Sequence, residues 1–137
     1  MRIFLDANSL FSATKSDGIV RQILGLLSAA GHECCVNGYV IGEARRNLVT
    51  KSPGSEAALE RLLADLSDTG IPLSGPAVDE IQSLAEKDRP VLAAAIAGRC
   101  DVLLTGDRAH FGRWFGKTLA GVAIHSPRSL AEKLLNK

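Results

Sequence analysis

Two aspartates each follow a short apolar run that reads as a β-strand. Asp6 comes after RIFL near the start of the chain, and Asp107 comes after VLLTG much later. In open parallel sheets, ligands bind beyond the carboxyl ends of the strands. If the two strands are neighbours, these acids face each other there, which is the arrangement that a cation site needs. The simpler alternative for the first acid is that Asp6 or Asn8 caps the following helix.

Two further acids lie on predicted helices. Glu43, in YVIGEARRNLV, stands at the edge of an apolar stripe, a position that a half-buried surface glutamate also occupies. Asp88, in KDRPVLAAAIAGRC, is followed by apolar residues at i+3, i+4 and i+7, which places it on the core-facing side. The alternative is that Asp88 caps its helix. Asp101 precedes a strand and is interpreted as a turn residue at the opposite end of the sheet.

Four carboxylates in one place would repel one another, by roughly 4 kcal/mol per close pair at an effective dielectric near 20. They must hold protons or bind a cation. Mg²⁺ or Mn²⁺ suits such oxygen ligands, lowers the pKa of a bound water and stabilises charge on a phosphodiester. No histidine is then needed as a base.

The elements that must position these acids alternate along the chain. Helical patterns lie between most of the apolar runs, and this alternation favours a parallel sheet covered by helices on both faces, a three-layer α/β/α sandwich. The predicted strands are 2–5, 33–36, 71–73, 102–105 and 122–125. One predicted helix follows Asp6. Three others span 39–49, 76–87 and 88–99, and three more begin at 17–18, 52–53 and 126–127.

Composition indicates one folded domain over residues 1–137. The chain is 46% hydrophobic and carries a formal net charge of +1, so it has no strong overall field to attract an anion. No apolar run is long enough for a membrane span, and MRIFLD does not read as a signal peptide, so a cytoplasmic protein is expected. The three cysteines are odd in number and are expected to be buried, reduced thiols, and their spacing does not favour zinc.

The acids in this order and in these contexts resemble the PIN-domain ribonucleases. The matching segments cover almost the whole chain, and the part from Asp88 to Asp107 is the most specific. They are FLDAN, GEARRNL, KDRPVLAAAIAGRCDVLLTGD and GVAIHSPRSLAEKLL.

The resemblance implies a central five-stranded parallel sheet with the first and fourth strands in the middle, and metal-dependent cleavage of RNA that leaves 5′-phosphate and 3′-hydroxyl ends. By position, Asp6, Glu43, Asp88 and Asp107 resemble the acidic metal cluster, and Asn8 and Thr105 resemble polar positions beside it. Many relatives carry another acid soon after the last aspartate. Here Arg108, Ala109 and His110 follow, which leaves the number of metal ions open.

Basic residues near the acids are candidates to contact the phosphate backbone, although solvated Arg and Lys are common on any surface. Arg46, Arg108 and Arg113 are the candidates we select, with Arg108 first, from a set that also contains Arg45, Lys51, Arg89 and Lys117. The aromatic residues Phe111, Trp114 and Phe115 are expected to pack in the core or at a dimer interface rather than stack on bases.

The leading hypothesis is a metal-dependent endoribonuclease that acts as the toxin of a toxin–antitoxin pair. It would have RNA as substrate, a small antitoxin protein as partner, and a homodimer formed through apolar side chains in 41–63. The alternatives are a PIN nuclease for RNA maturation or decay, and a non-catalytic RNA-binding or oligomerisation module whose acidic site has lapsed. No G-x-G-x-x-G opens a helix, which disfavours a dinucleotide-binding protein.

Overall fold

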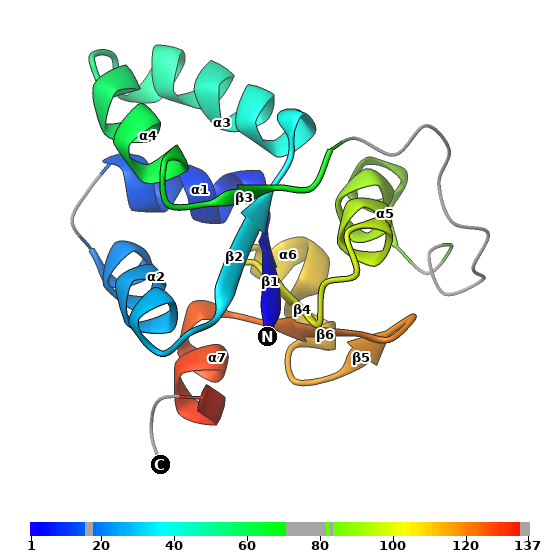
Figure 1. Ribbon diagram of the computed structural model, residues 1–137. Coiled ribbons are helices and arrows are strands. Elements are labelled where there is room, and N and C mark those ends of the chain that lie inside the picture. The colour runs from blue at the N-terminus through cyan, green and yellow to red at the C-terminus, as the bar shows by residue number, and fades with distance from the viewer. Residues whose placement is uncertain (16–17, 71–81, 83, 135–137) are drawn as a thin grey trace.

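A parallel sheet forms the centre of the molecule (Figure 1). The computed structural model describes residues 1–15, 18–70, 82 and 84–134. Within these residues six strands form one sheet in the order β3-β2-β1-β4-β6-β5. The strands are β1 (Arg2–Leu5), β2 (Glu33–Val36), β3 (Ser67–Asp68), β4 (Val102–Leu104), β5 (Thr118–Leu119) and β6 (Val122–His125).

The sheet confirms the predicted topology. All neighbouring strands from β3 to β6 pair in parallel, and β1 and β4 lie in the middle. The one addition among the described residues is β5, which pairs antiparallel with β6 at one edge. A two-residue edge strand is too short to show an alternating pattern, so the sequence carries no signal for it.

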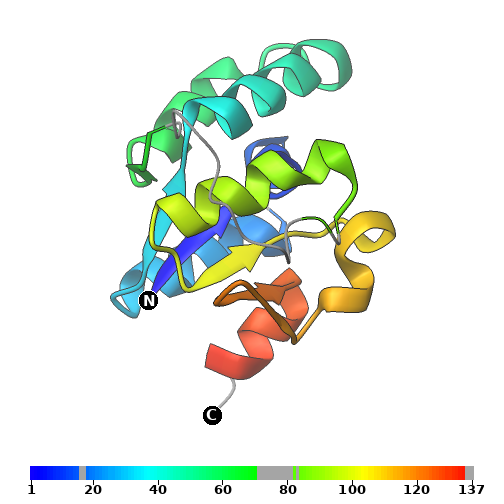
Figure 2. The same cartoon turned by 90° about the vertical axis from the view of Figure 1, so that its right-hand side faces the viewer.

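Helices cover both faces of the sheet. In Figure 1, α1, α2 and α7 lie to one side of the sheet and α5 lies to the other, and Figure 2 shows α5 lying across its own face with α7 below it. The helices are α1 (Ala7–Lys15), α2 (Ile19–Ala29), α3 (Gly38–Lys51), α4 (Glu56–Leu63), α5 (Arg89–Ala97), α6 (Arg108–Phe111) and α7 (Pro127–Leu134), with 3-10 turns η2 (Glu86–Asp88) and η3 (Gly112–Trp114). None of the described helices is long and apolar enough to cross a bilayer.

The central strands are apolar on both faces because helices bury both faces. Ile3, Phe4 and Leu5 on β1 are fully buried, as are Leu103 and Leu104 on β4. Their burial explains why these strands read as continuous apolar runs. It also means that the first polar residues after them must emerge at the carboxyl edge of the sheet.

One predicted boundary shifts in the structure, and two predicted elements lie wholly or mostly outside the described residues. The third strand is β3 at Ser67–Asp68, and the predicted residues 71–73 lie outside the described residues, as does most of the predicted helix 76–87. The helix expected from 52–53 begins at Glu56, because a turn intervenes. In that turn Gly54 has a φ of +88°, a left-handed conformation that glycine adopts without strain.

Candidate metal centre

The register of β1 and β4 brings the first and last predicted acids to one edge of the sheet. Leu5 pairs with Leu104, and the backbone N–H of Asp6 donates to the carbonyl of Leu104 at 3.2 Å. The chain order reverses between these two strands, because β1 continues to β2 on one side and β4 continues to β6 on the other. In open α/β sheets this switch point is where ligands bind.

Asp6 is buried and held by two donors. Its Oδ1 accepts from the backbone N–H of Ser9 at 2.8 Å, so Asp6 does cap α1, and its Oδ2 accepts from the hydroxyl of Thr105 at 2.5 Å. Burial raises the pKa of Asp6, and the charge of Asp107 adds to this, while the hydrogen bonds from Thr105 and Ser9 oppose it. Without a nearby cation, the ionised form of this buried carboxylate is therefore unfavourable in the folded protein.

Thr105 links Asp6 to Asp107. It is fully buried, and the hydroxyl that donates to Asp6 also accepts from the backbone N–H of Asp107 at 3.1 Å. A hydroxyl can do both at once, because it has one proton and two lone pairs. Thr105 therefore orients the carboxylate of one acid and the backbone of the other.

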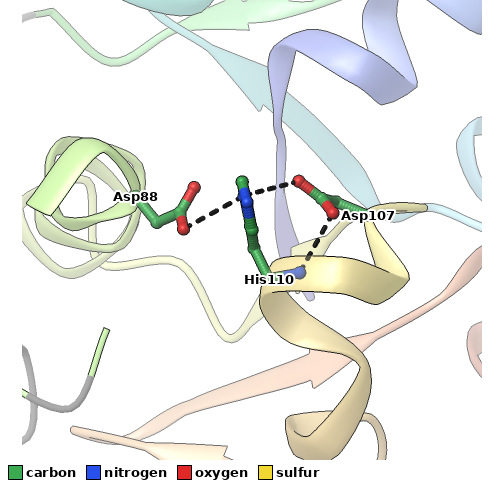
Figure 3. A group of neighbouring side chains, drawn as sticks. All are labelled: Asp88, Asp107 and His110. Carbon is green, nitrogen blue, oxygen red and sulfur yellow. Dashed lines mark hydrogen bonds and ion pairs between the residues drawn. The ribbon is translucent and has the colours of Figure 1, made fainter. Parts of the chain in front are cut away.

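Asp88, Asp107 and His110 converge on one point (Figure 3). One oxygen of each carboxylate and one imidazole nitrogen all lie within 4.8 Å of one another. Nδ1 of His110 lies 3.0 Å from Oδ2 of Asp107 and 3.3 Å from Oδ2 of Asp88. The other oxygen of Asp107 caps α6 by accepting from the backbone N–H of His110 at 3.1 Å. This cap places the imidazole ring over the same carboxylate.

The side chain of Asp88 does not cap its helix. Asp88 stands at the start of α5, but no capping hydrogen bond forms, so that alternative is wrong. The residue is buried, with 8% of its surface exposed, as expected for the core-facing side of α5. Its Oδ2 is buried without a hydrogen bond and has only the His110 contact. A buried carboxylate oxygen in this state calls for a further ligand.

Glu43 lies near this group but outside it. It is half-buried on α3, as its place at the edge of the apolar stripe predicts. Burial first, and then the carboxylate of Glu43 one turn later on α3, raise the pKa of Tyr39. The charge of Asp88 also raises it, so Tyr39 lies within electrostatic range of both Glu43 and Asp88. Glu43 is not among the three residues that meet within 4.8 Å.

Two predicted basic residues border the acids. A hollow of about 350 Å³ is lined by Arg108 and Arg113 together with Asp88 and His110. Both arginines are exposed, and the guanidinium of Arg113 lies 5.0 Å from the ring centre of Trp114. The two arginines therefore border the same hollow as Asp88.

The other predicted residues are less directly placed. Arg46 is exposed on α3, and its charge acts on Tyr39 beside Glu43. Asn8 is exposed in the first turn of α1 and borders a separate small hollow with Gly106. Phe111 packs in the core, as expected.

A larger hollow of about 790 Å³ lies between α2 and α4, beside the amino end of β2. One acid on its wall, Glu33, is already paired with Arg2 and accepts from Ser67. Among the described residues, the metal-ligand group of carboxylates and imidazole occurs only beside the smaller hollow. The side chains therefore favour the smaller hollow, and not the larger one, as the place of a metal site.

Sequence reasoning missed three neighbours of the acids. The backbone N–H of Ser9 donates to the capping carboxylate of Asp6, and its hydroxyl donates to the carbonyl of Leu104 at 3.1 Å; its place three residues after Asp6 was the available signal. The backbone N–H of His110 donates in the same way to Asp107, which lies three residues earlier. Tyr39 lies one turn before Glu43, so helical spacing alone pairs them.

The site fits a divalent cation on its own geometry. Its donors are carboxylate oxygens with one imidazole nitrogen, and the buried Oδ2 of Asp88 lacks a hydrogen bond. Asp88 and Asp107 are the acids that converge directly, Asp6 joins them through Thr105, and Glu43 is not part of the group. The group of Asp88, Asp107 and His110 is thus compatible with a divalent cation, since such ions bind carboxylate oxygens and imidazole nitrogen.

The sequence matches no protein-family profile and no curated protein. Solved structures do match. VapBC2 from Rickettsia felis is 14% identical with a TM-score of 0.66, covering 92% of this chain and 98% of that one. VapBC from Salmonella typhimurium is 16% identical with a TM-score of 0.65, covering 93% and 98%. PAE2754 from Pyrobaculum aerophilum is 17% identical with a TM-score of 0.62, covering 100% and 91%.

These matches run over nearly the full length of both chains. Likeness at such low identity reports on the fold, which agrees with the topology that the sequence motifs imply. The chain therefore has the α/β fold of the PIN-domain proteins.

Proposed function

We propose that this protein is an Mg²⁺- or Mn²⁺-dependent endoribonuclease and that Asp6, Glu43, Asp88 and Asp107 form its metal-binding site. The observation that carries the proposal is the buried Oδ2 of Asp88, which has no hydrogen bond and lies in one group with the carboxylate of Asp107 and the imidazole of His110. Among the described residues, the polar contact of this oxygen is with Nδ1 of His110 at 3.3 Å, which compensates the negative charge only in part. A bound cation would compensate it.

Each residue has a part in this proposal. The metal, when bound, supplies a water of lowered pKa and stabilises charge on the transferring phosphoryl group. Asp88 and Asp107 bind it, and Thr105 holds the carboxylate of Asp6 in place through its hydroxyl. No side chain needs to act as a general base.

The substrate is placed by the hollow beside the acids. Arg108 and Arg113 line it, so a phosphate of the RNA backbone can bind there while the adjacent scissile phosphate faces Asp88 and Asp107. Arginine donors suit phosphate oxygens because the guanidinium presents several N–H groups in a plane. Arg46, beside Glu43 on α3, would contact the backbone on the other side of the acids.

The biological role we infer is that of a toxin in a toxin–antitoxin pair. The Rickettsia felis and Salmonella typhimurium neighbours are VapBC complexes, in which a PIN-domain toxin is paired with an antitoxin. By analogy, a small antitoxin protein would bind this chain. A homodimer would form through α3 and α4, where Val49 on α3 is 59% exposed.

The central experiment compares two aspartates at opposite ends of β4. Cleavage of a fluorescently labelled single-stranded RNA is followed in Mg²⁺, in Mn²⁺ and in excess chelator, for the wild type, Asp107→Asn and the control Asp101→Asn. Asp101 lies before β4 and binds the backbone N–H of Arg2 at the far end of the sheet. We expect cleavage to require the metal, to be lost in Asp107→Asn, and to persist in Asp101→Asn.

Unchanged cleavage by Asp107→Asn would falsify the assignment of the site. Wild-type protein that binds no divalent cation in calorimetry would instead favour the non-catalytic module. Mapping of the product ends tests the reaction type, since we expect 5′-phosphate and 3′-hydroxyl termini. Growth on expression separates the biological roles: a toxin arrests the cell unless its antitoxin is present, and a maturation nuclease does not.

A further inference from the structure

The imidazole of His110 lies between two of the proposed metal ligands (Figure 3). Its Nδ1 is 3.0 Å from Oδ2 of Asp107 and 3.3 Å from Oδ2 of Asp88. The backbone of His110 is fixed by the cap that Asp107 makes on α6, so the position of the ring follows from the start of the helix. The side chain is 29% exposed and borders the hollow of about 350 Å³.

These separations match those between ligands of one metal ion. Two donors about 2.1 Å from an octahedral ion and at right angles to each other lie about 3 Å apart, and donors on opposite sides lie about 4.2 Å apart. The nitrogen lies 3.0 Å and 3.3 Å from its two oxygen neighbours, and the three atoms lie within 4.8 Å of one another. One ion can therefore contact all three with little rearrangement.

A second observation points to the same place. Oδ2 of Asp88, the oxygen nearest to Nδ1, is buried and has no hydrogen bond, although Asp88 has only 8% of its surface exposed. The contact between Nδ1 of His110 and this oxygen, at 3.3 Å, is within ion-pair distance but does not form a hydrogen bond, so the oxygen keeps an unused capacity to bind a further group. The geometry leaves a nitrogen and an oxygen facing one shared point.

We propose that His110 is a metal ligand through Nδ1, which makes the site a mixed nitrogen and oxygen site. The inference deepens the proposed nuclease function and rests on it. Imidazole is a preferred ligand of first-row transition metals, whereas Mg²⁺ prefers oxygen donors throughout. His110 therefore biases the site toward ions such as Mn²⁺ or Co²⁺ and away from Mg²⁺.

Coordination by nitrogen can be observed directly. Pulsed electron paramagnetic resonance of the Mn²⁺-loaded protein detects coupling to a ¹⁴N nucleus in the first coordination shell. We expect this coupling in the wild type, its loss in His110→Asp, and its retention in the matched control His32→Gln. His32 lies away from the acids and contacts the amino terminus at 3.0 Å.

Selectivity gives a second readout that does not depend on activity. His110→Asp keeps a ligand at the position but replaces nitrogen by oxygen, so it should still bind Mn²⁺. We expect the preference for Mn²⁺ over Mg²⁺, measured by calorimetry, to fall by about tenfold, which corresponds to about 1.4 kcal/mol. Melting curves in chelator establish that the variant is folded.

The outcomes separate this inference from the proposed function. Wild-type protein that binds Mn²⁺ at Asp88 and Asp107 without ¹⁴N coupling overturns the role of His110 and leaves the metal site intact. Equal selectivity of wild type and His110→Asp does the same. Wild-type protein that binds no divalent ion overturns both proposals.

Discussion

At the amino end of the sheet, charged side chains are paired with one another, whereas at the carboxyl end like charges are gathered together. Arg2 contacts Glu33 at 2.6 Å, and its backbone N–H donates to Asp101 at 2.8 Å. At the carboxyl end, among the described residues, His110 is the one basic group within ion-pair distance of Asp88 and Asp107.

The pKa directions express the same difference. A hydrogen bond from Ser67 and the nearby Arg2 lower the pKa of Glu33 at the amino end. Burial raises the pKa of Asp6 at the carboxyl end. The first arrangement is typical of groups that stabilise the fold, and the second is typical of groups kept for binding or catalysis. Substitutions at the two ends should therefore have opposite consequences for stability and activity.

The largest expected effect is on activity, from Asp88→Asn. Removing one charged oxygen of the proposed site should lower the rate of RNA cleavage by about 100-fold or more, the upper range for perturbing a metal site. Melting in chelator should show no loss of stability, because the buried Oδ2 makes no hydrogen bond that the substitution would break. Glu33→Gln at the amino end is the control and should keep full activity per folded molecule. Loss of activity in both variants would erase the distinction between the two ends.

The next largest effect is expected on metal affinity, from substitution of Thr105, which acts through the two acids that it contacts. Thr105→Val removes the donor to Asp6 and the acceptor for Asp107. We expect metal affinity to weaken by about tenfold, as for other groups that orient metal ligands. Thr105→Ser keeps the hydroxyl and should restore affinity. Equal weakening in Thr105→Ser would indicate that packing of the methyl group, and not the hydroxyl, is what matters.

A smaller effect, on stability alone, is expected at Arg2. Arg2→Met keeps much of the apolar stem but loses the contact with Glu33 and the hydrogen bond from Nε to the carbonyl of Gly98 at 3.0 Å. The pair is partly exposed, so we expect a loss of about 1 kcal/mol in the free energy of unfolding. Denaturant unfolding measures this. A decrease in the rate of RNA cleavage by the folded variant would contradict the separation of roles.

The smallest effect is the pH dependence at Asp6. Its pKa is raised in the folded protein, so the folded state holds a proton more readily than the unfolded state, and the charged form is destabilising at neutral pH. Asp6→Asn should therefore melt a few degrees higher than the wild type at pH 7 in chelator. The difference should shrink as the pH falls toward the ordinary range of an aspartate. A difference in melting temperature that does not change with pH would show that the charged form of Asp6 does not destabilise the folded protein.

Much of the fold could be predicted from local pattern. The central strands show as apolar runs because both faces are buried, and α5 and α7 show because Asp88 and Pro127 mark their starts. The edge strands β3 and β5 could not be predicted well. Each has two residues, and what makes them strands is the neighbour that they pair with, which local sequence does not encode.

The sequence by itself determined which residues carry charge and at which ends of the strands they stand, because burial of the strands forces polar residues to the loops. Only the tertiary structure decided which acids meet. The parallel register of β1 and β4 brings Asp6 beside Thr105, and the placement of α5 and α6 brings Asp88, Asp107 and His110 within reach of a single ion. Distances between residues far apart in the chain follow from packing, and spacing along the sequence does not contain them.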